Sequence, residues 1–138
     1  MCKVGDIIVI ENCERDSQKI GRHSFVVLST DEGEIEGMSF DLLCNIMCSF
    51  DGKGNEYKKK KLSYPENMAY SANQENILHG HNKDGFIKAG IYFLFNRADI
   101  DYKVIGNIQT ELYLKLINYI ESMNPNDIKY VSDNLRGE

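Results

Sequence analysis

The sequence predicts an α+β domain that is mainly β, built as a compact barrel or strongly bent sheet with helical cover. Short β-branched and aromatic runs recur along most of the chain, separated by turn-prone glycine, asparagine and aspartate residues. One segment with helical spacing of apolar residues follows near the end. The 138 residues suit one domain, which we expect over residues 1–123, with 124–138 as a C-terminal extension carrying a short helix.

The first half of the chain carries the strands that are easiest to recognise. They are expected at residues 7–10, 23–29, 34–38 and 42–50, and the glycine of Gly5-Asp6 marks the start of the first. Residues 42–50 are the most apolar of these runs, so we expect them to form a central strand. The polar residues between 12 and 22 predict a loop.

The second half begins with a glycine-rich turn at residues 51–55. The lysine run beyond it is expected to start the partner strand or to form an extended loop. Residues 63–84 lose all periodicity and predict a long surface loop, a feature that is often functional. Strand character returns at residues 85–89, 91–95 and 102–106.

The clearest helix lies after these strands. Thr110 is a suitable N-cap and Glu111 suits the first turn. Apolar residues then recur at helical spacing and predict a face that packs on the sheet: Leu112, Leu116, Tyr119 and Ile120. Asn124-Pro125 ends this helix and is expected to open a second, weaker one that carries Ile128, Val131 and Leu135.

The formal net charge of −5 means that the whole molecule does not attract nucleic acid, so any such binding needs a local basic patch. One candidate exists, made of Lys53, Lys58, Lys59, Lys60 and Lys61. Tyrosines flank this run, and aromatic rings beside cations suit stacking on unpaired bases. The simpler interpretation is a solvated surface that guards a sheet edge against aggregation.

The cysteine and apolar patterns indicate a cytoplasmic protein. Cys2, Cys13, Cys44 and Cys48 lack the C-x-x-C spacing of a zinc site, so we expect free structural thiols in a reducing compartment. No apolar stretch is long enough to span a bilayer, and the first residues lead directly into a strand without a signal-peptide pattern. His79-Gly80-His81 is more typical of an exposed loop than of a metal site, so no metal is expected.

Two segments near the start carry a resemblance to a known family. They are Val4-Gly5-Asp6-Ile7-Ile8-Val9 and Gln18-Lys19-Ile20-Gly21-Arg22-His23-Ser24-Phe25-Val26-Val27-Leu28-Ser29. Lys61-Leu62, Asp84-Gly85-Phe86-Ile87-Lys88-Ala89 and Val104-Ile105-Gly106 follow in the same order. The chain thereby resembles the MazF/PemK family of toxin endoribonucleases, whose members begin with a Gly-Asp strand and a Gly-x-Arg-Pro strand.

The resemblance implies an SH3-like β-barrel with a C-terminal helix, usually assembled as a homodimer. It implies the toxin of a toxin–antitoxin system, which cleaves single-stranded RNA at short sequences without a metal or cofactor. The implied partner is an antitoxin whose disordered acidic tail occupies the RNA groove. One alternative is a catalytically inactive relative of the same fold that binds RNA or protein. Another is an SH3-like barrel that serves only as a protein-interaction module.

The resemblance also names candidate site residues. His23 stands where the family has its catalytic arginine, with Arg22 just before it, and the family's Thr/Ser position falls on Cys48 or Ser49. An imidazole titrates near neutral pH and suits a general acid or base. Arg22 or Lys88 would hold the phosphate, and Ser49 would donate a hydrogen bond to a phosphate oxygen.

The RNA-binding candidates are the charged and aromatic residues along the expected groove: Lys19, Lys58, Lys59, Lys60, Lys61, Tyr64 and Lys88. Each named site residue also has a structural interpretation. His23 is equally well a hydrogen-bonded histidine at a strand start. Ser49 suits a strand-end hydroxyl that bonds to the backbone, while Arg22 and Lys88 suit solvated positions.

Overall fold

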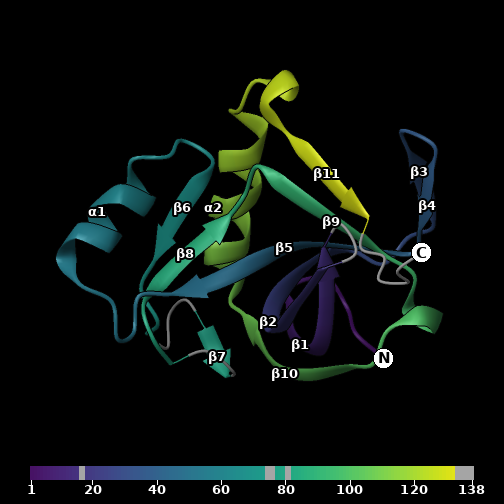
Figure 1. The fold of residues 1–138 in the computed structure, drawn as a ribbon, viewed down its shortest axis with the longest axis horizontal. Helices are drawn as coiled ribbons and strands as arrows, with labels where there is room; N and C mark the ends of the chain where they lie inside the picture. Colours follow the sequence, from purple (N-terminus) through teal and green to yellow (C-terminus); the bar gives the residue numbers. More distant parts are fainter. Residues whose placement is uncertain (16–17, 74–76, 80–81, 133–138) are drawn as a thin grey trace.

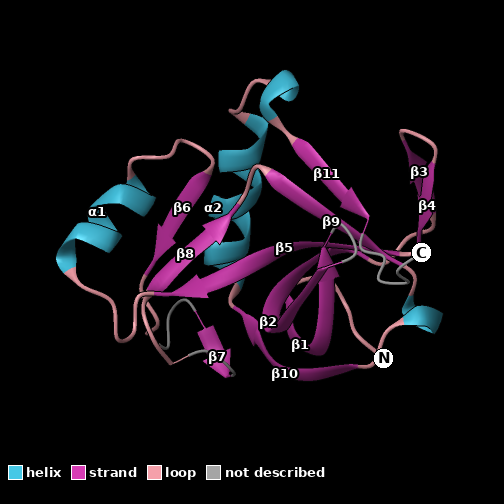
Figure 2. Ribbon diagram, viewed as in Figure 1, coloured by secondary structure: helices cyan, strands magenta, loops and turns pink. Residues whose placement is uncertain are grey.

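The computed structural model describes residues 1–15, 18–73, 77–79 and 82–132, which form a curved, largely antiparallel sheet with helices beside it (Figure 1). Strands dominate, which confirms the predicted mainly β α+β class (Figure 2). The strands of the first half are β1 (Asp6–Arg15), β2 (Gln18–Ser29), β3 (Gly33–Ile35), β4 (Met38–Phe40) and β5 (Leu42–Ser49). Those of the second half are β6 (Asn67–Tyr70), β7 (Ile77–His79), β8 (Gly85–Lys88), β9 (Ile91–Phe95), β10 (Tyr102–Ile108) and β11 (Lys129–Ser132). The α-helices are α1 (Asn55–Leu62) and α2 (Thr110–Glu121), and 3-10 helices lie at Arg97–Asp99 and Pro125–Asp127.

The sheet is organised around β5. Its strand order is β11-β9-β5-β2-β1-β10-β7, with β8 pairing with both β5 and β6. This order has two ends, so the pairing of the described strands does not close into a ring. β5 pairs with β9 through residues 42–44 and with β8 through residues 47–49, both on the side away from β2. Asn45 lies at this branch, where its buried side-chain amide donates to the carbonyl of Ile91 at 2.9 Å.

Two hydrophobic clusters fill the two faces of the sheet. The first places Leu112, Leu116 and Ile120 of α2 against strand residues such as Val26 and Met47. The expected helix and its apolar face are therefore confirmed, although the N-cap is Gln109 rather than Thr110. The second cluster is formed by strand residues and Cys2, so the curved sheet packs against itself there.

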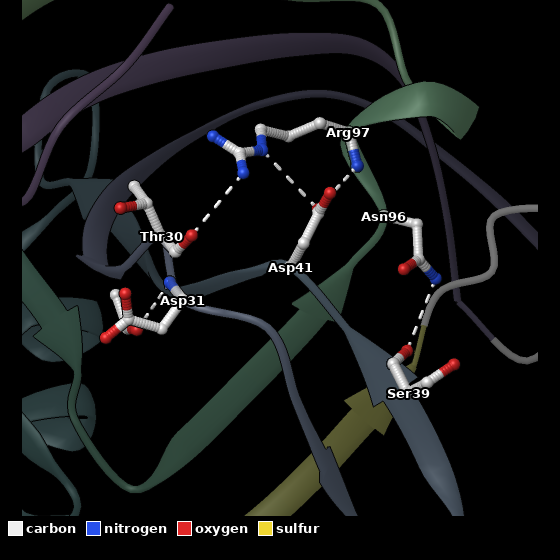
Figure 3. A network of polar contacts seen from close by, with 7 residues as sticks. Thr30, Asp31, Ser39, Asp41, Asn96 and Arg97 are labelled. Atoms are coloured by element: carbon white, nitrogen blue, oxygen red, sulfur yellow. Dashed lines mark hydrogen bonds and ion pairs between the residues drawn. The ribbon is translucent and has the colours of Figure 1, made fainter.

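A polar network fixes the β3–β4 hairpin to the end of β9 (Figure 3). The backbone N–H of Arg97 donates to Oδ1 of Asp41 at 2.8 Å, and Nε of the same arginine lies 3.5 Å from that oxygen. Nη2 of Arg97 donates to the carbonyl of Thr30, and the Asn96 amide donates to the carbonyl of Ser39. This hairpin lies across the molecule from α1 (Figure 1), so the network stabilises the end of the sheet remote from the lysine run.

The strands predicted at residues 7–10, 23–29, 42–50, 85–89, 91–95 and 102–106 are all present, but the loop expected at residues 12–22 was wrong. There β1 and β2 continue as a hairpin with bulges on either side of Cys13, whose side chain is fully buried. Gly21 has a φ of +85°, a left-handed conformation that favours glycine in such an irregular ribbon. The residues of this ribbon are mostly polar, so the sequence pattern indicated a loop.

The strand expected at residues 34–38 is instead a hairpin of two short strands, β3 and β4. Glu36 and Gly37 form its turn with φ angles of 53° and 81°. Two successive positive φ values are the signature of the tight turn that matches the twist of paired strands. A sharp turn therefore replaces the middle of the predicted strand.

The expectation for the lysine run was wrong, because it forms the helix α1 rather than a strand or loop. Lysine and glutamate are good helix formers. Glu56 lies in the first turn and three lysines lie in the last, which suits the helix dipole.

The prediction of a long loop for the segment 63–84 was also wrong. This segment contains β6 and β7, and the side chains of Met68, Tyr70 and Ile77 are buried.

The second helix expected after Asn124-Pro125 was wrong beyond its first turn. Among the described residues of this segment, up to 132, the only helix is the short 3-10 helix, begun by the Asn124 side chain, which accepts from the N–H of Asn126 at 2.9 Å. Val131 lies in β11, which pairs in parallel with β9. A β-branched and aromatic run prefers a strand beside an open sheet edge. Leu135 lies outside the described residues.

Candidate nucleic-acid interface

The end of β5 places a row of side chains across three strands. Ser24 of β2 pairs with Met47 of β5. Because the two strands are antiparallel, the same register places His23, the residue before Ser24, opposite Cys48, the residue after Met47. On its other side, Cys48 pairs with Phe86 of β8. Directly opposed residues of antiparallel strands share a face, so His23, Cys48 and Phe86 form one row. His23 and Cys48 are both half-buried, at the open end of the second hydrophobic cluster.

Two lysines bring positive charge to this row. Lys88 lies two residues after Phe86 in β8 and therefore on the same face. Burial raises the pKa of the Cys48 thiol, and the charges of Lys88 and Lys61 lower it by less. Because these charges act on Cys48, both ammonium groups lie near it. Because the net shift is upward, the thiol stays protonated at neutral pH, as a hydrogen-bond donor rather than a nucleophilic thiolate.

The raised pKa predicts slow alkylation of Cys48. At any given pH a raised pKa leaves less thiolate, so its reaction rate with iodoacetamide should be below that of a cysteine peptide at pH 7. The rate should still be rising above the pH at which the peptide levels off. Mass spectrometry separates this reaction from that of Cys2, Cys13 and Cys44, which are buried. A rate that levels off at or below pH 7.5 would show an activated thiolate and contradict the assignment.

Ser49 lies on the opposite face from this row, since side chains alternate along a strand. Its hydroxyl accepts a hydrogen bond from the backbone N–H of Asp51 at 2.9 Å. That contact is the strand-end arrangement expected for a structural serine. Of Cys48 and Ser49, Cys48 is therefore the one that shares a face with His23.

Arg22 is engaged away from the row. Its Nε donates to Oε2 of Glu11 at 3.2 Å, in an exposed ion pair. An exposed pair of this kind contributes little stability, so the arginine can exchange partners at low cost. The backbone of Lys19 lies in β2, but its side chain is outside the described part of the chain.

α1 lies beside β6, at the end of the molecule where β5 finishes and β8 begins (Figure 1). None of its residues is buried. Its position is fixed by the Asn67 side chain, whose amide donates to the carbonyl of Lys61 at 2.9 Å. Because Asn67 is itself buried in β6, this bond ties the last turn of the helix to the sheet.

Lysines in and just before α1 lie over aromatic rings in and next to this helix. The ring of Tyr57 has the Nζ atoms of Lys53 and Lys61 at 5.2 Å and 5.4 Å from its centroid. Lys61 also lies 5.9 Å from the ring of Tyr64, and Lys58 lies 5.4 Å from that of Phe50. Burial, and then the nearby Cys48 thiol, raise the pKa of Tyr57, so this ring borders the His23–Cys48 row.

The lysines of this surface lack acidic partners. Among the described residues, none of Lys53, Lys58, Lys59, Lys60 and Lys61 forms an ion pair with a carboxylate. Lys59 and Lys60 are exposed and make no ring contact that would hold them in place. Unpaired cations beside aromatic rings are suited to phosphates and unpaired bases.

A hollow of about 390 Å³ continues this surface towards α2. Its lining includes Lys58, Phe50 and Tyr70, and Lys115 of α2 joins them from the far side. Asp84 also borders it, but that carboxylate accepts the backbone N–H of Ala72 at 2.8 Å. Lys115 and Phe50 were not predicted as site residues; only the tertiary fold brings Lys115 to this hollow, whereas Phe50 lies just before the turn that leads into α1.

The described residues were also compared with two other features, a metal site and a membrane-spanning helix. They contain no group of three or more His, Cys, Asp or Glu side chains placed to hold a metal ion. Of the histidine pair considered above, His81 lies outside the described residues, as does the side chain of His79. In the part of the chain that the structure covers, no helix has both the length and the apolar character needed to cross a membrane.

No protein-family model, curated protein or solved structure matches this chain. The description of this molecule rests on its own fold and surface. It is a mainly β α+β domain with an imidazole, a neutral thiol and two ammonium groups gathered beside a lysine-rich helix.

Proposed function

We propose that this protein is a MazF/PemK-like toxin: a metal-independent endoribonuclease that cleaves single-stranded RNA at short sequences. The observation that carries the proposal is the row of His23 and Cys48 with Lys61 and Lys88 beside it, bordered by the unpaired lysines of α1. Acid–base, charge-stabilising and RNA-binding groups thus lie on one surface. The antiparallel run β10-β1-β2-β5 and the strand-built second cluster support the finer assignment of an SH3-like barrel.

The proposed reaction is attack of a ribose 2′-oxygen on the adjacent phosphorus, which breaks the bond to the 5′-oxygen and leaves a 2′,3′-cyclic phosphate. His23 takes the proton from the 2′-hydroxyl as general base. Lys88 and Lys61 stabilise the additional negative charge of the phosphorane, and the Cys48 thiol donates a hydrogen bond to a phosphate oxygen. The leaving 5′-oxygen takes a proton from solvent or from a lysine ammonium. The general base, the charge-stabilising lysines and the hydrogen-bond donor all come from the row at Cys48 and the two lysines beside it.

α1 supplies affinity in this proposal. Its exposed lysines follow the phosphate backbone, and Tyr57 and Tyr64 offer rings on which unpaired bases stack. The same surface would accept the acidic tail of an antitoxin in competition with RNA. The antitoxin partner, the homodimer and the cytoplasmic location remain predictions of the sequence.

The RNA-binding part is tested by Lys59→Gln/Lys60→Gln. Neither lysine makes a ring contact, so the exchange leaves the attachment of α1 intact. Loss of two phosphate contacts should lower the slope of log K against log salt by about 1.4, at ~0.7 per contact on a single strand. Fluorescence anisotropy of an unstructured RNA across a sodium chloride series measures this slope.

The matched control is Lys103→Gln/Lys129→Gln, which removes the same charge from exposed positions on β10 and β11. Its slope should equal that of the wild type. Equal slopes for both double variants would mean that α1 does not contact the backbone and would contradict its proposed role.

The second candidate function is a catalytically inactive relative that binds RNA or protein. It is favoured by His23 at the family's arginine position and by the pairing of Arg22 with Glu11. A binding protein of this kind would bind the same RNA with the same salt dependence and leave it intact. Expression in bacteria separates the two, because an active ribonuclease arrests growth and a binding protein does not.

A further inference from the structure

A second hollow, of about 680 Å³, lies at the C-terminal end of α2. It is bounded by the last turn of α2, the segment before β6, the β8–β9 turn and the start of β11. α2 covers the face of the sheet opposite the His23–Cys48 row, so this hollow is separate from the proposed RNA surface. Its volume lies in the range of small-molecule sites in proteins.

The walls of this hollow are held together by hydrogen bonds to main-chain carbonyls. The hydroxyl of Tyr119 donates to the carbonyls of Pro65 and Asn67, at 2.5 Å and 3.0 Å. The backbone N–H of Gly90 donates to the carbonyl of Glu66 at 3.3 Å. A Cβ on Gly90 would lie 2.7 Å from Cβ of Glu66 and 2.8 Å from Cε of Met123, so the walls meet closely there. The hollow is therefore preformed.

Glu66 gives the hollow its chemical character. Its side chain is half-buried and lines the hollow, yet its carboxylate has no ion pair or hydrogen bond with any residue that the structure describes. Burial, followed by the charge of Glu66, raises the pKa of Tyr119, so the carboxylate lies near the phenol ring. A carboxylate that lines a hollow without an ion-pair partner attracts a cation.

The surroundings reinforce this negative character. Asp127 adds a second carboxylate to the lining, against the single ammonium of Lys129. The carbonyl end of α2 also points here, and the last turn of that helix has no basic residue to offset its dipole. Apolar wall is supplied by Met123, Ile91 and the ring of Tyr119.

We infer that this hollow binds a small organic cation: an alkylammonium or guanidinium group on an apolar stem. The charged group would lie against Glu66 and Asp127, and the stem against Met123 and the Tyr119 ring. An anion would meet the two carboxylates, and a purely apolar ligand would leave Glu66 unpaired. The inference is independent of RNA cleavage.

The test is calorimetric titration of the full chain with agmatine, which carries both a guanidinium and an ammonium group on a butyl stem. We expect saturable binding at one site, weakened about tenfold or more by Glu66→Gln. Asp127→Asn, at an exposed position that tolerates exchange, should weaken binding by less. Glu121→Gln is the matched control, because this exposed carboxylate lies in the last turn of α2 but outside the lining.

The source of the cation is resolved by a second titration with N-acetyl-arginine amide. Tighter binding of this compound assigns the site to an arginine side chain of a protein, and tighter binding of agmatine assigns it to a free amine. Absence of saturable heat with both compounds at millimolar concentration would overturn the inference. Equal losses for Glu66→Gln and Glu121→Gln would overturn it as well, since only general charge would then matter.

Discussion

Replacing His23 with alanine is expected to abolish RNA cleavage while RNA binding and folding persist. His23 supplies the imidazole in the row with Cys48, so its loss removes the proposed base for the 2′-hydroxyl. Removal of a positioned general base typically costs about 10²- to 10⁴-fold in rate. The lysines of α1 remain, so affinity for RNA is retained. Single-turnover cleavage of a labelled unstructured RNA measures the rate, and anisotropy measures the binding.

Two further variants sharpen this prediction. His23→Arg introduces the catalytic arginine that the proposed MazF/PemK-like relationship expects at this position, and it should retain measurable cleavage. Arg22→Gln removes the neighbouring cation, which is paired with Glu11, and should leave the rate nearly unchanged. Wild-type cleavage by His23→Ala would show that the imidazole is structural and that the chemistry lies elsewhere.

Replacing Phe25 with alanine is expected to cause the largest loss of stability, about 3–5 kcal/mol in the free energy of unfolding. The ring is fully buried in the second hydrophobic cluster. It meets Phe93 and Phe95 edge to face, with centroids 5.1 Å and 5.2 Å apart. The truncation leaves a cavity and removes both ring contacts. Urea denaturation followed by circular dichroism gives the value.

The control for this prediction is Leu114→Ala, at an exposed position of α2. Surface exchanges of this kind usually change stability by less than about 0.5 kcal/mol. If Phe25→Ala and Leu114→Ala destabilise the chain equally, the strand-built cluster does not have the role assigned to it.

The features of the fold that could be predicted are those with a hydrophobic period. Strand alternation and β-branched runs located β5, β8, β9 and β10, and helical spacing located α2, because these elements bury one face. α1 was missed because it buries nothing: its lysines show no hydrophobic period, and its last turn is held to the sheet by the Asn67 side chain, a contact that exists only in the folded chain. β6 was missed because its two buried apolar side chains, Met68 and Tyr70, lie among polar residues and beside the buried but polar Asn67.

Some residues of the candidate site could likewise be predicted from the sequence, and others required the folded structure. His23, Lys61 and Lys88 could be named as candidates from the sequence because their residue types suit RNA and their order fits the predicted relationship to the MazF/PemK family. Choosing between Cys48 and Ser49 required strand register, since adjacent residues of a strand face opposite sides. The half-buried Glu66 could not be recognised, because the hollow it faces is formed by segments that meet only in the folded chain.

The most direct test of the ribonuclease proposal is incubation of the purified, folded chain in EDTA with two oligonucleotides of the same sequence. One is unmodified RNA and the other carries 2′-O-methyl groups throughout. The proposal predicts cleavage of the RNA alone, with 2′,3′-cyclic phosphate and 5′-hydroxyl ends, because the 2′-oxygen is the nucleophile. An intact RNA, or equal cleavage of the two oligonucleotides, would contradict the proposal.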